Sequence, residues 1–120
     1  TGHANSTRDM LSRLETMVLM GIDLPLPAIE RQIASGLDII VHLGRLRDKS
    51  RKVLEVTEVL GYWDGQIHLQ TIYRYEEIRK EDENVTENEK KDQENKVHGE
   101  WKKVAELFHR EKLVAAGYYI

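Results

Sequence analysis

The residues best suited to chemistry stand at the beginning of the chain, where Gly2, His3 and Asn5 lead into the expected start of a helix. Ser6, followed three residues later by Asp9, is typical of a helix N-cap, because the serine hydroxyl can accept a hydrogen bond from the Asp9 amide. A helix that begins this way presents free amides and the positive end of its dipole, which attract anions such as phosphate. These residues therefore predict an anion contact, with the His3 ring as a donor and Gly2 leaving room for the ligand.

A plainer interpretation of the same residues stays open. His3 and Asn5 are also residue types that satisfy the hydrogen bonds of turns and helix caps. In that case the start of the chain is structural and binds nothing.

Several other chemistries find no support in the sequence. The chain has no cysteine, which excludes disulfides and thiolate metal sites, and its five histidines include no pair four residues apart, so we expect no metal site. None of the eight glycines is followed by lysine, which excludes the phosphate loop Gly-x-x-x-x-Gly-Lys-Ser/Thr. An anion site at residues 2–6 would therefore need a second surface to hold a triphosphate.

Composition favours one modest domain in a reducing compartment, the cytoplasm. The chain has 120 residues and a net charge of −3. Residues 76–96 hold nine acidic and five basic residues, a balance of −4, which leaves +1 for the rest, so we expect no nucleic-acid partner. The sequence contains neither an apolar run long enough to span a membrane nor a signal peptide.

The hydrophobic pattern predicts an α+β fold. Helical spacing or strand-like alternation marks two N-terminal helices, a three-stranded antiparallel meander and a C-terminal helix, expected near residues 7–21, 27–35, 37–43, 53–60, 66–75 and 101–117. The segment 76–96 holds only two apolar residues and is predicted to be an acidic, flexible linker or an insertion. The basic stretch 44–52 between the first two strands is either a contact for an acidic partner or an ordinary solvated hairpin end.

The start of the chain resembles a known family. Thr1-Gly2-His3-Ala4-Asn5-Ser6 together with Ser12-Arg13-Leu14-Glu15 resembles the histidine box of the type II/type IV secretion ATPases, and the residues after Glu15 are most similar to the tight-adherence (Flp) pilus branch, the CpaF/TadA-like proteins. The similarity covers about residues 1–75. It continues through Met17-Val18-Leu19-Met20, Leu24-Pro25-Leu26, Arg31-Gln32-Ile33-Ala34-Ser35, Asp38-Ile39-Ile40-Val41, Arg45-Leu46-Arg47-Asp48 and Val56-Thr57-Glu58-Val59.

The resemblance implies a RecA-like P-loop ATPase domain, of which residues 1–75 would be the C-terminal part and 97–120 the closing strand and helix. The whole protein would be a hexameric motor, dependent on ATP and Mg, at the cytoplasmic face of the inner membrane. It would drive pilus assembly or protein export together with platform proteins of that membrane. His3 would contact the terminal phosphate, Gly2 and Asn5 would shape that contact, and Arg13 matches a family position that could equally form an ion pair on its helix.

The chain begins at Thr1 within an expected strand-to-helix connection, so we expect a portion of a longer protein whose phosphate loop lies upstream. Such a portion would bind neither ATP nor Mg alone and would be inactive. Its uncovered apolar surface could support a dimer. The alternative hypothesis is a non-enzymatic protein-interaction or oligomerisation module.

Overall fold

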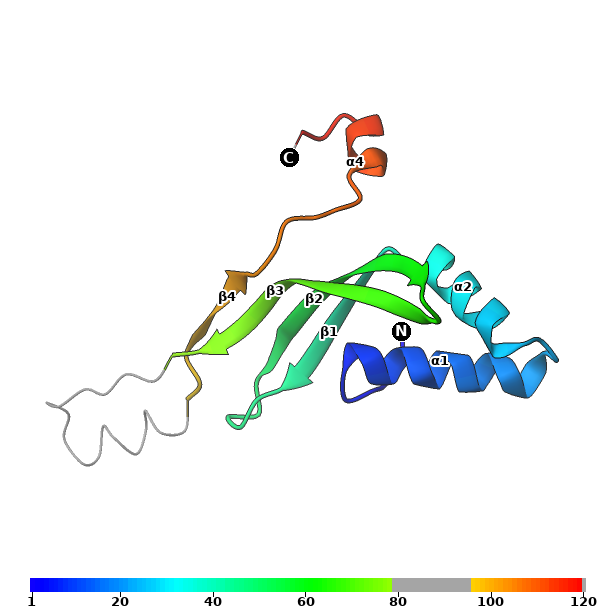
Figure 1. Ribbon diagram of the computed structural model, residues 1–120. Helices are drawn as coiled ribbons and strands as arrows, with labels where there is room; N and C mark the ends of the chain where they lie inside the picture. The colour runs from blue at the N-terminus through cyan, green and yellow to red at the C-terminus, as the bar shows by residue number, and fades with distance from the viewer. Residues whose placement is uncertain (79–95, 120) are drawn as a thin grey trace, which may run out of the picture.

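The computed structural model describes residues 1–78 and 96–119 and has an α+β fold. A four-stranded antiparallel sheet in the order β1-β2-β3-β4 forms its centre. Figure 1 shows α1 and α2 beside one face of this sheet and α4 set apart on the other side. The elements are α1 (Thr7–Gly21), α2 (Leu26–Gly36), β1 (Ile39–Arg45), β2 (Arg51–Trp63), β3 (Gln66–Glu77), β4 (Gly99–Lys103) and α4 (Glu111–Ala115).

The two N-terminal helices match the prediction to within about a residue at each end. Pro27 stands in the first turn of α2, where its missing N–H costs no helical hydrogen bond. Each helix turns one large aliphatic side chain fully inward, since Leu11 of α1 and Ile29 of α2 are both only 1% exposed. The apolar spacing therefore predicted the helices, although several apolar side chains of α1, Met17, Leu19 and Met20, remain exposed.

The buried core is small. Leu11 of α1 packs with Val59 of β2 and Ile67 of β3, and a ring of partly buried side chains surrounds them. In the part of the chain that the structure describes, only six apolar side chains are buried: Leu11, Ile29, Val59, Ile67, Ile72 and Val97. Each of them therefore carries a large share of the stability.

The predicted meander of β1, β2 and β3 is confirmed, and its second and third strands are longer than expected. Asp64 and Gly65 connect β2 to β3 with positive φ values of 52° and 74°, the backbone of a type I′ hairpin turn. Strand β3 continues through Glu77, so the first two residues of the predicted linker 76–96 belong to the sheet. Residues 79–95 of that linker lie outside the described residues.

The hydrophobic pattern predicted three strands followed by a long helix from Trp101, and this prediction is wrong. Residues 99–103 form β4, which pairs with β3, and the helix α4 begins only at Glu111. Trp101 stands opposite Tyr75 with the two rings edge to face, and its Nε1 donates to the Val53 carbonyl at 2.7 Å. These cross-strand contacts outweigh the helical spacing of the apolar residues in this segment, because strand formation depends on neighbours distant in the sequence.

The segment after β4 is attached to the sheet through a buried carboxylate. Glu58 of β2 is 1% exposed, and its two carboxylate oxygens accept hydrogen bonds from the backbone amides of Phe108 and His109, each at 2.8 Å. The His109 ring lies 2.8 Å from the Leu60 carbonyl, and Lys112 forms an ion pair with Asp38. Glu58 thereby ties the C-terminal segment to the middle of the sheet.

Candidate functional site

The predicted N-cap at the start of α1 is confirmed. Ser6 has extended backbone angles, and its hydroxyl accepts a hydrogen bond from the Asp9 amide at 3.0 Å. Its carbonyl accepts the first helical hydrogen bond, from the Met10 amide. The helix therefore begins at Thr7, where the sequence places it.

Asp9 accepts hydrogen bonds from two of the predicted site residues, from the backbone of Asn5 and from the side chain of Arg13. One of its carboxylate oxygens accepts the Asn5 backbone amide at 3.0 Å and the Arg13 Nε at 3.1 Å. These bonds lower the pKa of Asp9, with the Asn5 amide as the larger cause and Arg13 as the smaller. The Asp9 carboxylate thus supplies the negative charge that the positive end of the helix dipole attracts. The same charge lies next to the expected anion contact and would repel an anion there.

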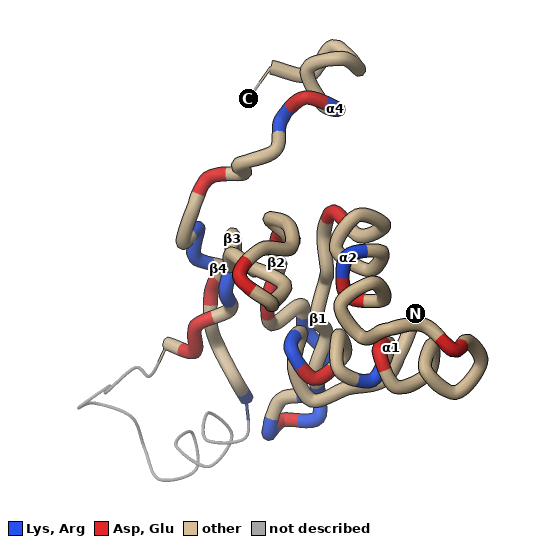
Figure 2. The backbone as a smooth tube through the Cα atoms, turned by 45° about the vertical axis from the view of Figure 1, so that its right-hand side comes forward, with Lys and Arg blue, Asp and Glu red and all other residues tan. Residues whose placement is uncertain are grey.

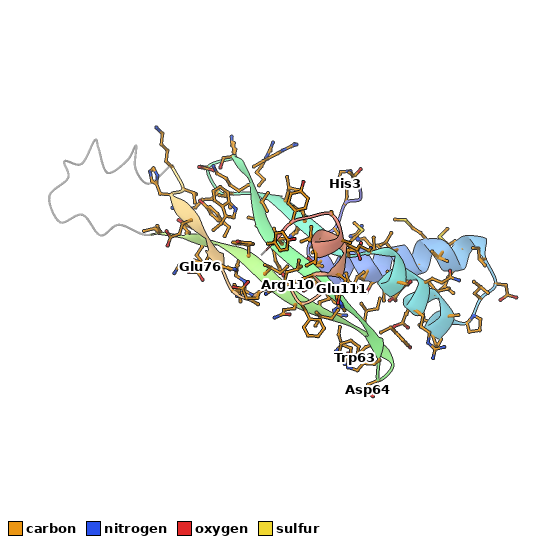
Figure 3. The ribbon with its side chains drawn as sticks, turned by 90° about the horizontal axis from the view of Figure 1, so that it is seen from above. His3, Trp63, Asp64, Glu76, Arg110 and Glu111 are labelled. Atoms are coloured by element: carbon orange, nitrogen blue, oxygen red, sulfur yellow. The ribbon has the colours of Figure 1, made fainter. Side chains whose placement is uncertain are left out.

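His3 and Gly2 lie apart from this cluster. His3 is exposed, and across residues 1–78 and 96–119 its side chain makes no hydrogen bond or ion pair. Figure 3 shows it on the opposite side of the molecule from Trp63 and Asp64 at the β2–β3 turn. A Cβ on Gly2 would approach the Met10 side chain to within 2.5 Å, so the space left by this glycine is used by Met10.

The sequence pattern did not predict that the hydroxyl of Thr7, next to the N-cap, is buried. Thr7 is 4% exposed, and its Oγ1 is the one buried side-chain oxygen or nitrogen in the described residues without a hydrogen-bond partner. Leaving a buried hydroxyl without a partner costs roughly 1–3 kcal/mol. Nothing in the sequence distinguishes Thr7 from an ordinary first residue of a helix.

These residues do not fit a triphosphate by themselves. They offer one exposed imidazole and a helix start whose dipole is already met by Asp9. Arg13, a candidate for nucleotide binding, is engaged with Asp9. No group of three or more His, Cys, Asp or Glu side chains that could hold a metal ion occurs in the described part of the chain.

The tip between β1 and β2 is more ordered than a solvated hairpin end requires. Asp48 accepts hydrogen bonds from the Ser50 amide at 2.9 Å and from the Val97 amide at 3.0 Å. Arg47 forms an ion pair with Glu77 of β3. Figure 2 shows blue basic segments at this end of β1 and β2 with a red acidic segment between them.

The Asp48 carboxylate gives the tip a predictable pH dependence. The Ser50 hydroxyl, the Val97 amide and the Ser50 amide lower the pKa of Asp48 from 3.8 to about 2. A lowered folded-state pKa contributes stability that is complete above the unfolded value and is lost as the pH falls through the folded one. As the pH falls from about 5 to about 2, hydrogen exchange at the Val97 amide, corrected for the intrinsic rate, is therefore expected to become faster. Asp48→Asn should show the faster exchange already at neutral pH, and identical protection in both proteins would contradict this role of the carboxylate.

No protein-family model matches the chain, and no curated protein matches it either. Among the described helices, none is long and apolar enough to cross a bilayer.

Proposed function

We propose that the chain is a C-terminal portion of a RecA-like secretion or pilus-assembly ATPase, whose hydrolysis of ATP drives pilus assembly or protein export. In this proposal the phosphate loop and Mg ligands come from other parts of the protein at the cytoplasmic face of the inner membrane. This portion contributes assembly surface and one nucleotide contact, His3. The histidine-box resemblance of residues 1–15 and the capped start of α1 support the proposal.

The observation that carries the proposal is the amount of apolar surface that the fold leaves uncovered. Large hydrophobic side chains are exposed on α1, on β1 and along the C-terminal segment, among them Met17, Met20, Leu43, Phe108 and Tyr119. The Cα radius of gyration is 19.1 Å, against roughly 14 Å for a compact domain of this length. Exposed apolar surface of this extent marks interaction sites, which supports a chain that works as part of a larger assembly.

The start of α1 supports the same conclusion. His3 is exposed and makes no side-chain hydrogen bond in the described residues, and the buried Thr7 hydroxyl has no partner. Asp9, at the same helix start, is already bonded to the Asn5 amide and to Arg13, which leaves the His3 ring as the donor available to a ligand. A site of this kind can add a single hydrogen bond to a phosphate held elsewhere, and we assign no step of hydrolysis to it.

Substitution of His3 tests the proposal. The 120-residue chain alone should show no ATP hydrolysis, and in the full-length protein His3→Ala should lower the hydrolysis rate by about tenfold to 100-fold, the effect of losing one hydrogen bond to a charged phosphate. The control is His98→Ala, which removes a second exposed imidazole and should change the rate by less than about twofold. Robust turnover by the isolated chain would overturn the proposal, and so would full activity of the His3 variant.

A non-enzymatic interaction or oligomerisation module is the second candidate. It is favoured by the ordered basic tip, which Asp48 and the Arg47–Glu77 ion pair hold against the rest of the sheet. The two candidates differ in one clear respect, since only the ATPase portion requires a phosphate loop in the same polypeptide.

A further inference from the structure

In the described part of the chain, strand β1 forms an edge of the sheet, with apolar side chains on its outward face. Among the strands of residues 1–78 and 96–119 it pairs with β2 alone, and exposed and partly buried side chains alternate along it. Ile39, Val41 and Leu43 are 41%, 49% and 61% exposed. An exposed edge strand with an apolar face is a template for pairing with another extended chain.

The same row of side chains ends in an uncompensated positive charge. Arg45 follows Leu43 on the outward face and stands directly opposite Arg51 of β2. Both arginines are exposed, and in the described residues neither has an ion-pair partner. Like charges opposed across two strands destabilise a sheet, so an acidic group placed here would relieve the repulsion. We refer to Ile39, Val41, Leu43 and Arg45 as the edge row.

The residues beside the edge row are also apolar and basic. Val53 of β2 stands opposite Leu43, and the half-exposed Trp101 donates its Nε1 hydrogen to the Val53 carbonyl at 2.7 Å. The Lys52 ammonium lies 6.0 Å from the centre of the Trp101 ring. The neighbourhood of Leu43 and Arg45 is therefore both apolar and basic.

We propose that the free edge of β1 binds an extended protein segment as an additional strand, with apolar residues opposite Ile39, Val41 and Leu43 and an acidic residue opposite Arg45. Backbone hydrogen bonds to the edge would supply affinity, and the period of two along the row would select the segment. A carboxylate beside Arg45 would form charge-assisted hydrogen bonds. The interaction does not depend on the proposed ATPase function.

Three other occupants fit the edge row less well. A lipid bilayer cannot satisfy the backbone groups of a strand edge. A nucleic acid would meet one arginine and three apolar side chains along the row. A second copy paired antiparallel about His42 would place each Arg45 opposite an Ile39, which brings charge against apolar surface. An acidic segment with alternating apolar residues is the occupant that complements every position.

The test uses the full 120-residue chain and a labelled peptide, Glu-Thr-Val-Thr-Ile-Thr-Val, measured by fluorescence anisotropy. We expect it to bind at least about tenfold more tightly than a scrambled peptide of the same composition, since only one register pairs every position. Arg45→Glu should weaken binding about tenfold and should transfer the preference to a peptide that begins with Lys. Val41→Lys, at a half-exposed position, should weaken both peptides.

Lys49→Glu is the matched control, because it makes the same charge change in the tip outside the edge row and should alter binding by less than about twofold. Equal binding of the Glu-first peptide and its scrambled version would overturn the proposal. Binding of the Glu-first peptide that Arg45→Glu does not change would overturn it as well. A dimer in light scattering that Val41→Lys abolishes would also overturn it, in favour of a second copy as the occupant.

Discussion

Replacing Leu11 with alanine is expected to lower the free energy of unfolding by about 3 kcal/mol, within the roughly 2–5 kcal/mol range for truncating a buried leucine. Leu11 is 1% exposed and joins α1 to Val59 and Ile67 of the sheet. The effect should be large here because so few apolar side chains are buried in the described residues. Urea denaturation followed by circular dichroism measures it.

Leu19→Ala is the control for this prediction. Leu19 lies on the same helix and is 46% exposed, so its truncation should cost less than about 1 kcal/mol. Equal loss of stability in the two variants would contradict the description of the core.

Replacing Glu58 with alanine is expected to release the C-terminal segment from the sheet. The substitution removes both acceptors of the Phe108 and His109 amides. Hydrogen bonds to a charged group contribute roughly 1.5–3 kcal/mol each, so hydrogen exchange at these two amides should accelerate by at least about 100-fold. Glu58→Gln should give a smaller acceleration, because the carboxamide keeps one acceptor and turns an NH₂ group toward the other donor.

Glu55→Gln provides the matched control. Glu55 lies on the same strand, but its carboxylate accepts hydrogen bonds from the hydroxyls of Thr57 and Thr71, which can reorient, and none from the C-terminal segment. Exchange at Phe108 and His109 should be unchanged in this variant. Unchanged protection in Glu58→Ala would show that the segment is held by other contacts.

Local patterns predicted the first 75 residues well, because their elements are specified by neighbours in the sequence. Ser6 and Asp9 identify the helix start, Pro27 fits the first turn of the second helix, and Asp64-Gly65 identifies the hairpin turn. Each of these features depends on residues within three or four positions of one another. Their physical cause is therefore visible in the sequence.

The part after residue 96 depends on distant partners and could not be predicted in the same way. Trp101 belongs to a strand because Tyr75 and the Val53 carbonyl lie beside it. Glu58 looks like the polar member of an alternating strand, yet it is buried because two amides 50 and 51 residues later bind it. Helical spacing in this segment gave the wrong element because no local signal reports such partners.

The candidate site was predicted only in part. The cap at Ser6 was foreseen, but the engagement of Asn5 and Arg13 by Asp9 was only one of two open interpretations. The unpartnered Thr7 hydroxyl and the edge row of β1 depend on burial and strand order, which residue types do not report. The role of His3 stays a prediction.

The measurement that tests the central proposal most directly is the sequence of the coding region upstream of Thr1. If the chain is a portion of a secretion ATPase, the same reading frame contains Gly-x-x-x-x-Gly-Lys-Ser/Thr followed by acidic residues suited to Mg. A start codon next to Thr1, or an upstream sequence without a phosphate loop, would contradict the proposal and leave the interaction module as the function.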